Sequence, residues 1–120
     1  MLRRILIADR EPAVADTLAA YLTLRGLEAR TAYDAKQAMT EVRIWRPDIF
    51  LADPSMPGMD AVELAGAVRP YAPECRLLLA AEPSWAAEMR ERAAWLEILE
   101  KPVDPETLLH RLAESAGLAA

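Results

Sequence analysis

The sequence is poor in the residues on which several kinds of protein chemistry depend. It has one cysteine, Cys75, and one histidine, His110, so it can form neither an internal disulfide nor a cysteine-based metal site. Cys75 begins an apolar run, where a buried and unreactive thiol is expected. His110 stands in a predicted helix far from the ends of the predicted strands, so no Ser or Cys nucleophile has a histidine base beside it. We therefore expect a protein that is not an enzyme.

Glycine, basic clusters and long apolar runs are scarce as well. Only 4 glycines are present, and no glycine-rich loop could cradle a nucleotide phosphate. With 19 acidic and 14 basic residues the net charge is −5, which argues against a nucleic-acid surface on this domain. No apolar run approaches the roughly 20 residues that a membrane helix needs, and the N-terminus lacks a signal-peptide pattern. We expect a cytoplasmic protein with no membrane contact.

Strand patterns alternate with helical patterns five times along the chain. The predicted strands are 4–9, 27–31, 48–53, 75–80 and 96–99, and the predicted helices are 12–25, 34–45, 60–69, 84–94 and a last one from 104. Residues of the type that caps helices precede the last four helices, namely Asp34, Asp60, Ser84 and Asp104. A loop is expected over 54–59. The alternation predicts one α/β domain over 1–120, with a parallel sheet and helices on both of its faces.

Charged residues follow three of these strands. Asp9 ends the first strand, Asp53 ends the third, and Lys101 follows the fifth. Taken singly, each would be an ordinary solvated loop charge. Because the carboxyl ends of parallel strands meet at one edge of a sheet, where ligands bind in such folds, the three together predict a functional site.

Four segments resemble the receiver domain of bacterial response regulators. They are ILIAD at 5–9, PDIFLAD at 47–53, MPGMD at 56–60 and Lys101-Pro102. The resemblance runs from the first strand to the last helix. It implies a flavodoxin-like (βα)5 fold with strand order 2-1-3-4-5 and a function in two-component signal transduction.

The resemblance also implies roles for individual residues. Asp53 matches the aspartate that accepts a phosphoryl group from a histidine kinase, and Lys101 matches the lysine that contacts this group. Asp9 matches one acid of the pair that holds Mg²⁺, with Asp53 and Ser55 as the further ligand positions. The peptide bond before Pro102 is often cis in the family, and such a bond is accessible to proline.

Arg10 departs from this pattern, because it stands where the family has the acid that ligates the metal directly. Three carboxylates and a lysine give a typical pocket a formal charge of −2, whereas two acids with Arg10 and Lys101 give zero. Mg²⁺ requires several hard oxygen ligands, so we expect magnesium binding to be weak or absent. The guanidinium could pair with Asp53 in the metal's place, in a network with Lys101, or extend into solvent. Glu11 is expected to point elsewhere.

Two further departures concern the conformational switch. Ala80 occupies the position of a Thr or Ser whose hydroxyl contacts the phosphoryl group, and a methyl group has no donor to offer. Ile98 occupies the position of an aromatic residue that swings inward on activation, and a β-branched side chain has restricted rotamers. The sequence thus favours a receiver with impaired phospho-switching that signals through protein contacts. A conventional phosphoacceptor receiver is the first alternative, and a small flavin- or nucleotide-binding protein of the same fold is the second.

Large side chains mark a candidate contact surface. Receiver domains contact other proteins, or a second copy, through the face formed by the fourth helix, the fifth strand and the fifth helix. In this chain that region contains Trp85, Met89, Trp95 and Ile98. Aromatic residues and Met are enriched at interfaces. The other interpretation is that they fill the core between the helix and the sheet, as most helical apolar stripes do.

Overall fold

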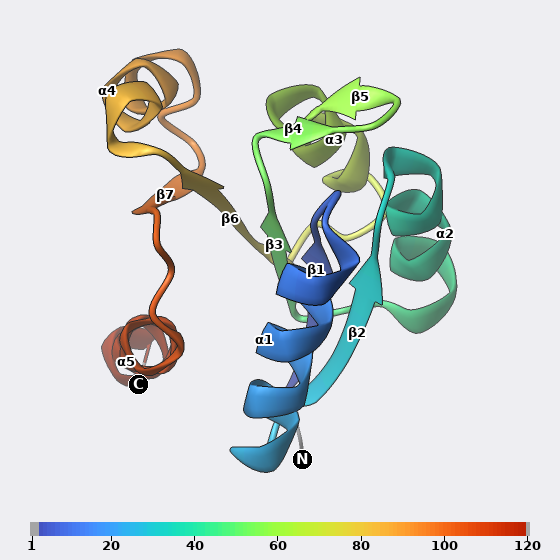
Figure 1. The fold of residues 1–120 in the computed structure, drawn as a ribbon, viewed down its shortest axis with the longest axis vertical. Helices are drawn as coiled ribbons and strands as arrows, with labels where there is room; N and C mark the ends of the chain where they lie inside the picture. Colours follow the sequence, from blue (N-terminus) through green and yellow to red (C-terminus); the bar gives the residue numbers. More distant parts are fainter. Residues whose placement is uncertain (1–2, 120) are drawn as a thin grey trace.

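A five-stranded parallel sheet forms the centre of the molecule (Figure 1). The computed structural model describes the backbone of residues 3–119 and the side chains of residues 3–113. The strands are β1 (Arg4–Ala8), β2 (Glu28–Ala32), β3 (Ile49–Ala52), β6 (Arg76–Ala81) and β7 (Glu97–Glu100). Their order is β2-β1-β3-β6-β7, and every pair in the sheet is parallel. This confirms the predicted order 2-1-3-4-5.

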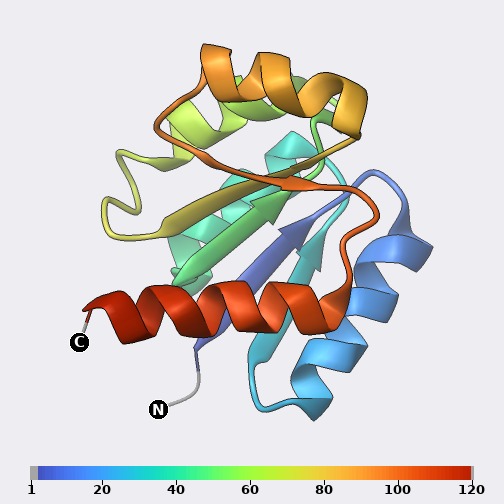
Figure 2. The same ribbon diagram turned by 90° about the vertical axis from the view of Figure 1, so that its left-hand side faces the viewer.

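Helices cover both faces of the sheet, as predicted (Figure 2). They are α1 (Pro12–Leu24), α2 (Ala35–Trp45), α3 (Ala61–Val68), α4 (Pro83–Arg92) and α5 (Pro105–Ala119). Residues of α1 and α5 pack on one face, and residues of α2, α3 and α4 pack on the other. Because both faces are covered, the central strands are almost fully buried and read as continuous apolar runs.

Side-chain caps fix the beginnings of three helices as the sequence predicts. Asp34 accepts a hydrogen bond from the Gln37 N–H, and Asp60 accepts from the N–H groups at the start of α3. Asp104 accepts from the Thr107 N–H. The predicted cap at Ser84 is wrong, because α4 begins one residue earlier, at Pro83, without a side-chain cap. Proline needs no partner for an N–H in the first helical turn, so it opens the helix itself.

The segment predicted as a loop contains a small hairpin. Two antiparallel strands, β4 (Ser55–Met56) and β5 (Met59–Asp60), flank a turn at Pro57 and Gly58. Gly58 has a φ of 96°, which glycine adopts without steric cost. A proline followed by glycine is typical of a tight turn, and this signal was present in the sequence.

Two smaller expectations are confirmed. Cys75 is buried, and burial raises the pKa of its thiol to about 12, which keeps it protonated and unreactive. The Lys101–Pro102 peptide bond is cis. No helix in the described part of the chain is long and apolar enough to cross a bilayer.

Candidate functional site

Backbone hydrogen bonds fix the three predicted site residues at one edge of the sheet. The N–H of Asp9 donates to the Ala32 carbonyl over 3.0 Å, and the N–H of Asp53 donates to the Ala8 carbonyl over 2.9 Å. The N–H of Lys101 donates to the Ala81 carbonyl over 2.8 Å. Each bond extends the ladder of the sheet by one residue, so these residues have well-defined positions.

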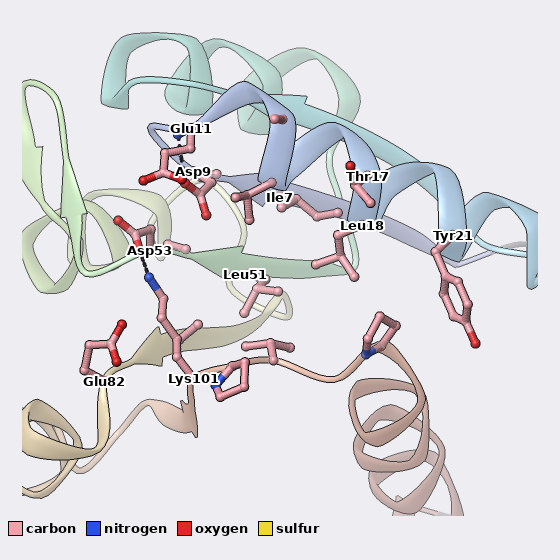
Figure 3. A pocket seen from close by; sticks show the side chains of 18 residues that line it. Ile7, Asp9, Glu11, Thr17, Leu18, Tyr21, Leu51, Asp53, Glu82 and Lys101 are labelled. Carbon is pink, nitrogen blue, oxygen red and sulfur yellow. Dashed lines mark hydrogen bonds and ion pairs between the residues drawn. The ribbon is translucent and has the colours of Figure 1, made fainter.

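Asp53 and Lys101 form an ion pair at the centre of this edge (Figure 3). The side chain of Asp53 is only 8% exposed and that of Lys101 is 30% exposed. A carboxylate buried to this extent requires a charged or hydrogen-bonding partner, and the ammonium group supplies one. The prediction that these two residues, 48 positions apart in the chain, lie close together is therefore confirmed.

Arg10 lies outside this arrangement. It is exposed, it does not line the cavity beside Asp53, and no described residue forms an ion pair with it. The predicted network of Asp53, Arg10 and Lys101 is therefore wrong for Arg10. The alternative, in which Arg10 extends into solvent, is correct. Lys101 already neutralises the buried carboxylate, and a long guanidinium side chain is better hydrated at the surface.

Two glutamates that the sequence analysis did not assign to the site also line the cavity, Glu11 and Glu82. Glu11 was expected to point elsewhere. Instead its N–H donates to Asp9 Oδ1 over 2.9 Å, and this local turn places both carboxylates on the same side, as Figure 3 shows. Glu82 follows β6 directly. Its position after the fourth sheet strand was the signal that could have identified it.

The cavity is acidic rather than neutral. Four carboxylates, from Asp9, Glu11, Asp53 and Glu82, and the ammonium group of Lys101 line it, so the formal charge of the lining is −3 instead of the predicted zero. Burial raises the pKa of Asp9, the negative charge of Asp53 raises it further, and the hydrogen bond from the Glu11 N–H opposes both effects. Ionised Asp9 is therefore less favourable in the folded protein than in the unfolded chain.

The described side chains do not fit a magnesium ion as they stand. Among residues with described side chains, no three carboxylate, cysteine or histidine groups lie close enough together to hold a metal. Asp53 faces Lys101, and the side chain of Ser55 is exposed at the start of β4. Mg²⁺ demands near-octahedral oxygen ligands, and the exposed Arg10 supplies none.

The two predicted switch positions are buried in different parts of the core. Ala80 lines the cavity beside Asp53, and its methyl group presents no hydrogen-bond donor there. Ile98 packs on the opposite face of the sheet, in the cluster that contains residues of α4.

The four candidate interface residues separate into two groups. Trp85 and Trp95 are each 52% exposed, whereas Met89 and Ile98 are buried in the core beneath α4. The prediction of a contact surface is therefore wrong for Met89 and Ile98, whose side chains fill the space between helix and sheet. The two tryptophans remain available for contacts.

The chain is similar to known proteins over most of its length. It matches the family model described as response regulator receiver domain over residues 5–113. An uncharacterised 14.6 kDa protein from Leptolyngbya boryana is 34% identical over 119 residues, which cover 96% of this chain and 90% of that protein. The DNA-binding response regulator MtrA of Mycolicibacterium smegmatis is 36% identical over 69 residues, 58% of this chain and 30% of that protein. The match thus spans less than a third of MtrA.

Solved structures show the same arrangement of strands and helices. The chemotaxis response regulator CheY4 of Vibrio cholerae has a TM-score of 0.83 at 27% identity, covering 95% of this chain and 98% of that one. The REC domain of AraT, a response regulator from Geobacillus stearothermophilus, has a TM-score of 0.81 at 26% identity, covering 95% and 92% of the two chains.

Proposed function

Since the chain belongs to the response regulator receiver family of two-component systems, we propose that Asp53 is its phosphoacceptor position and that its magnesium binding and phospho-switching are impaired. In this proposal it signals through protein–protein contacts, with a histidine kinase or another signalling protein as partner. A cytoplasmic location is part of the proposal. The domain itself contacts neither nucleic acid nor membrane.

The observation that carries the proposal is the pairing of Asp53 with Lys101 while no acid occupies position 10. Phosphoryl transfer depends on cations that neutralise the charge on the transferring group, and in this family that cation is Mg²⁺. One magnesium ligand is replaced by an exposed guanidinium, and the ammonium of Lys101 is already bound to the acceptor carboxylate. Both features favour slow or absent phosphorylation.

The buried positions of Ala80 and Ile98 support impaired switching. A hydroxyl at position 80 would lie in the cavity beside Asp53 and could follow a phosphoryl oxygen, which a methyl group cannot do. Ile98 packs on the α4 side of the sheet, where its branched side chain has restricted rotamers. A phosphorylated Asp53 would therefore lack the two side chains through which the family transmits the change.

Intact mass spectrometry after incubation with acetyl phosphate tests this proposal. Wild type, Asp53→Ala and Arg10→Asp are each incubated with and without magnesium chloride. We expect no phosphoryl adduct on wild type or Asp53→Ala, and a magnesium-dependent adduct on Arg10→Asp, because this change restores a metal ligand. A magnesium-dependent adduct on wild type that is lost in Asp53→Ala would overturn the proposed impairment.

A conventional phosphoacceptor receiver is the second candidate, and Glu11 is the observation that favours it. Its carboxylate lines the cavity beside Asp9 and could replace the acid missing at position 10. Under this alternative, wild type gains a phosphoryl group with magnesium and Glu11→Gln does not. Glu88→Gln, at an exposed position of α4, is the matched control and should behave as wild type.

A further inference from the structure

The cavity beside Asp53 extends well beyond the acidic edge of the sheet. Its volume is about 860 Å³ and 18 residues line it. It runs from Asp53 and Lys101 along α1 to Tyr21, between α1, the sheet and the segment that leads into α5, as Figure 3 shows. Cavities that bind small organic molecules have volumes of about 300–1,000 Å³ and mostly apolar walls.

The walls of this cavity away from the edge are apolar. Ile7 and Leu51 come from the sheet, Leu18 and Val14 from α1, and Val103 from the segment before α5. Of the 13 residues of α1, only Asp16 carries a formal charge. An apolar wall of this kind stabilises a bound hydrocarbon or aromatic group by removing it from water.

The far end of the cavity offers no free charge. Tyr21 lines it there and donates its hydroxyl hydrogen to Glu106, which also forms an ion pair with Arg25. The charges of Glu106 and Arg25 are therefore paired, and the hydroxyl of Tyr21 has a hydrogen-bond partner. A ligand that reaches this end therefore meets an aromatic ring and paired polar groups, and its own charge would have to lie elsewhere.

The near end carries excess negative charge. Asp53 is paired with Lys101, but no described residue forms an ion pair with Asp9, Glu11 or Glu82. The neighbouring carboxylates of Asp9 and Glu11 lie at the end of an apolar cavity, where they repel an anion and attract a cation. The cavity therefore combines a hydrophobic slot with a cation-selective end, which is the complement of an amphipathic amine.

We propose that this cavity binds a small organic cation, namely a primary amine with an aliphatic or aromatic body. Its ammonium group lies beside the carboxylates of Asp9 and Glu11, and its apolar body lies between Leu18 and Val103. Binding of this ligand requires neither a phosphodonor nor Mg²⁺, so it stands or falls independently of the function proposed above. It adds a small-molecule site to the protein-contact surfaces.

Titrations of the whole chain with three probes of equal length test the proposal. The probes are hexylamine, hexan-1-ol and hexanoate, and binding is followed by ¹H–¹⁵N NMR at pH 7 without magnesium or phosphodonor. We expect saturable shifts at the amides of Leu18 and Val103 with hexylamine, at least ten-fold weaker binding of hexan-1-ol, and none of hexanoate. Equal binding of hexanoate, or no saturable shift with hexylamine, would overturn the proposal.

Variants separate the two halves of the site. Val103→Phe should fill the slot and weaken hexylamine at least ten-fold. Val14→Phe, at a half-exposed position of α1 that also lines the cavity, is a second filling variant should the first not fold. Glu11→Gln should weaken hexylamine several-fold without changing hexan-1-ol, whereas Glu88→Gln should change neither. Unaltered hexylamine affinity in a folded filling variant, or in Glu11→Gln, would contradict the assignment.

Discussion

A single ion pair accounts for the buried carboxylate at position 53. Asp53 is almost fully buried and Lys101 is its cationic partner, whereas the other lysine of the chain, Lys36, is exposed on α2. Removing one partner of a buried pair leaves the other without compensation, and this usually costs more than the pair contributes. Because Lys101 is partly exposed, water would reach the vacated space and reduce that cost.

We therefore predict that Lys101→Met lowers the free energy of unfolding by about 1–3 kcal/mol at pH 7. Urea unfolding followed by tryptophan fluorescence measures this change. Lys36→Met is the matched control and should lie within about 0.5 kcal/mol of wild type. Combining Lys101→Met with Asp53→Asn should recover most of the lost free energy of unfolding, because no unpaired charge then remains. If the double variant is no more stable than Lys101→Met, the ion pair does not explain the loss.

The raised pKa of Asp9 leads to a second prediction, on how the stability of the fold depends on pH. Because burial and the charge of Asp53 raise its pKa, protonated Asp9 is favoured in the folded state and its ionisation costs stability above the raised pKa. Asp9→Asn keeps the oxygen that accepts the Glu11 N–H and removes the charge. We expect the variant to be more stable than wild type at pH 7, with the difference closing as the pH falls and wild-type Asp9 becomes protonated. A difference that grows at low pH would contradict this.

The meeting of Asp9, Asp53 and Lys101 could be predicted from the sequence, because the ends of parallel strands share one edge of a sheet. The orientations of Arg10 and Glu11 could not. They depend on one local hydrogen bond, from the Glu11 N–H to the Asp9 carboxylate, and a pattern of charges carries no information about such a turn. The predicted neutral pocket was wrong for this reason and because Glu82, directly after β6, also lines the cavity.

Between elements, Asp60 links the beginning of α3 to α4. It accepts from two N–H groups of α3 and forms an ion pair with Arg92 over 3.0 Å. Burial alone would raise the pKa of Asp60, but the Arg92 guanidinium and the two N–H groups outweigh it and lower the pKa below 3.8. Stability from the ionised carboxylate is thus fully present above pH 3.8 and is lost as the pH falls through the lower folded pKa.

Asp60→Asn tests this link, because asparagine caps helices about as well as aspartate does. We predict that the variant is less stable than wild type by about 0.5–1 kcal/mol at pH 7. The two should converge in urea unfolding as the pH falls below 3.8 and wild-type Asp60 takes up its proton. An unchanged difference at low pH would show that the loss comes from the cap and not from the charge.

Strong local signals made most elements predictable, and their absence explains the errors. Continuous apolar runs predicted the three central strands, β1, β3 and β6, and Asp34, Asp60 and Asp104 cap the helices they were expected to cap. The β4–β5 hairpin has two-residue strands, too short for any alternation of polar and apolar residues. Its only signal was the turn at Pro57 and Gly58.

On the scale of the whole molecule, two exposed tryptophans lie near the beginning and beyond the end of α4. Trp85 lies on α4 and Trp95 in the segment between α4 and β7. Large aromatics that remain exposed in a folded domain are typical of contact surfaces. Met89 and Ile98 lie beneath α4 and support the region from inside.

From this we predict self-association through the face that contains α4, β7 and α5. Analytical ultracentrifugation over a wide concentration range should show a reversible monomer–dimer equilibrium. Trp85→Ala combined with Trp95→Ala should weaken the dimer at least ten-fold, about 1.4 kcal/mol. Tyr71→Ala, at a similarly exposed aromatic position outside this face, is the control and should leave the equilibrium unchanged. A monomer at the highest concentrations would contradict a dimer.

In the proposed function, the arginine at position 10 keeps Mg²⁺ away from Asp53. Titration of ¹⁵N-labelled wild type and Arg10→Asp with magnesium chloride, at constant ionic strength to hold screening fixed, tests it most directly. The account predicts saturable shifts at the amides of Asp9 and Asp53 in Arg10→Asp and none in wild type. Saturable shifts of these amides in wild type, with an affinity equal to that of Arg10→Asp, would contradict it.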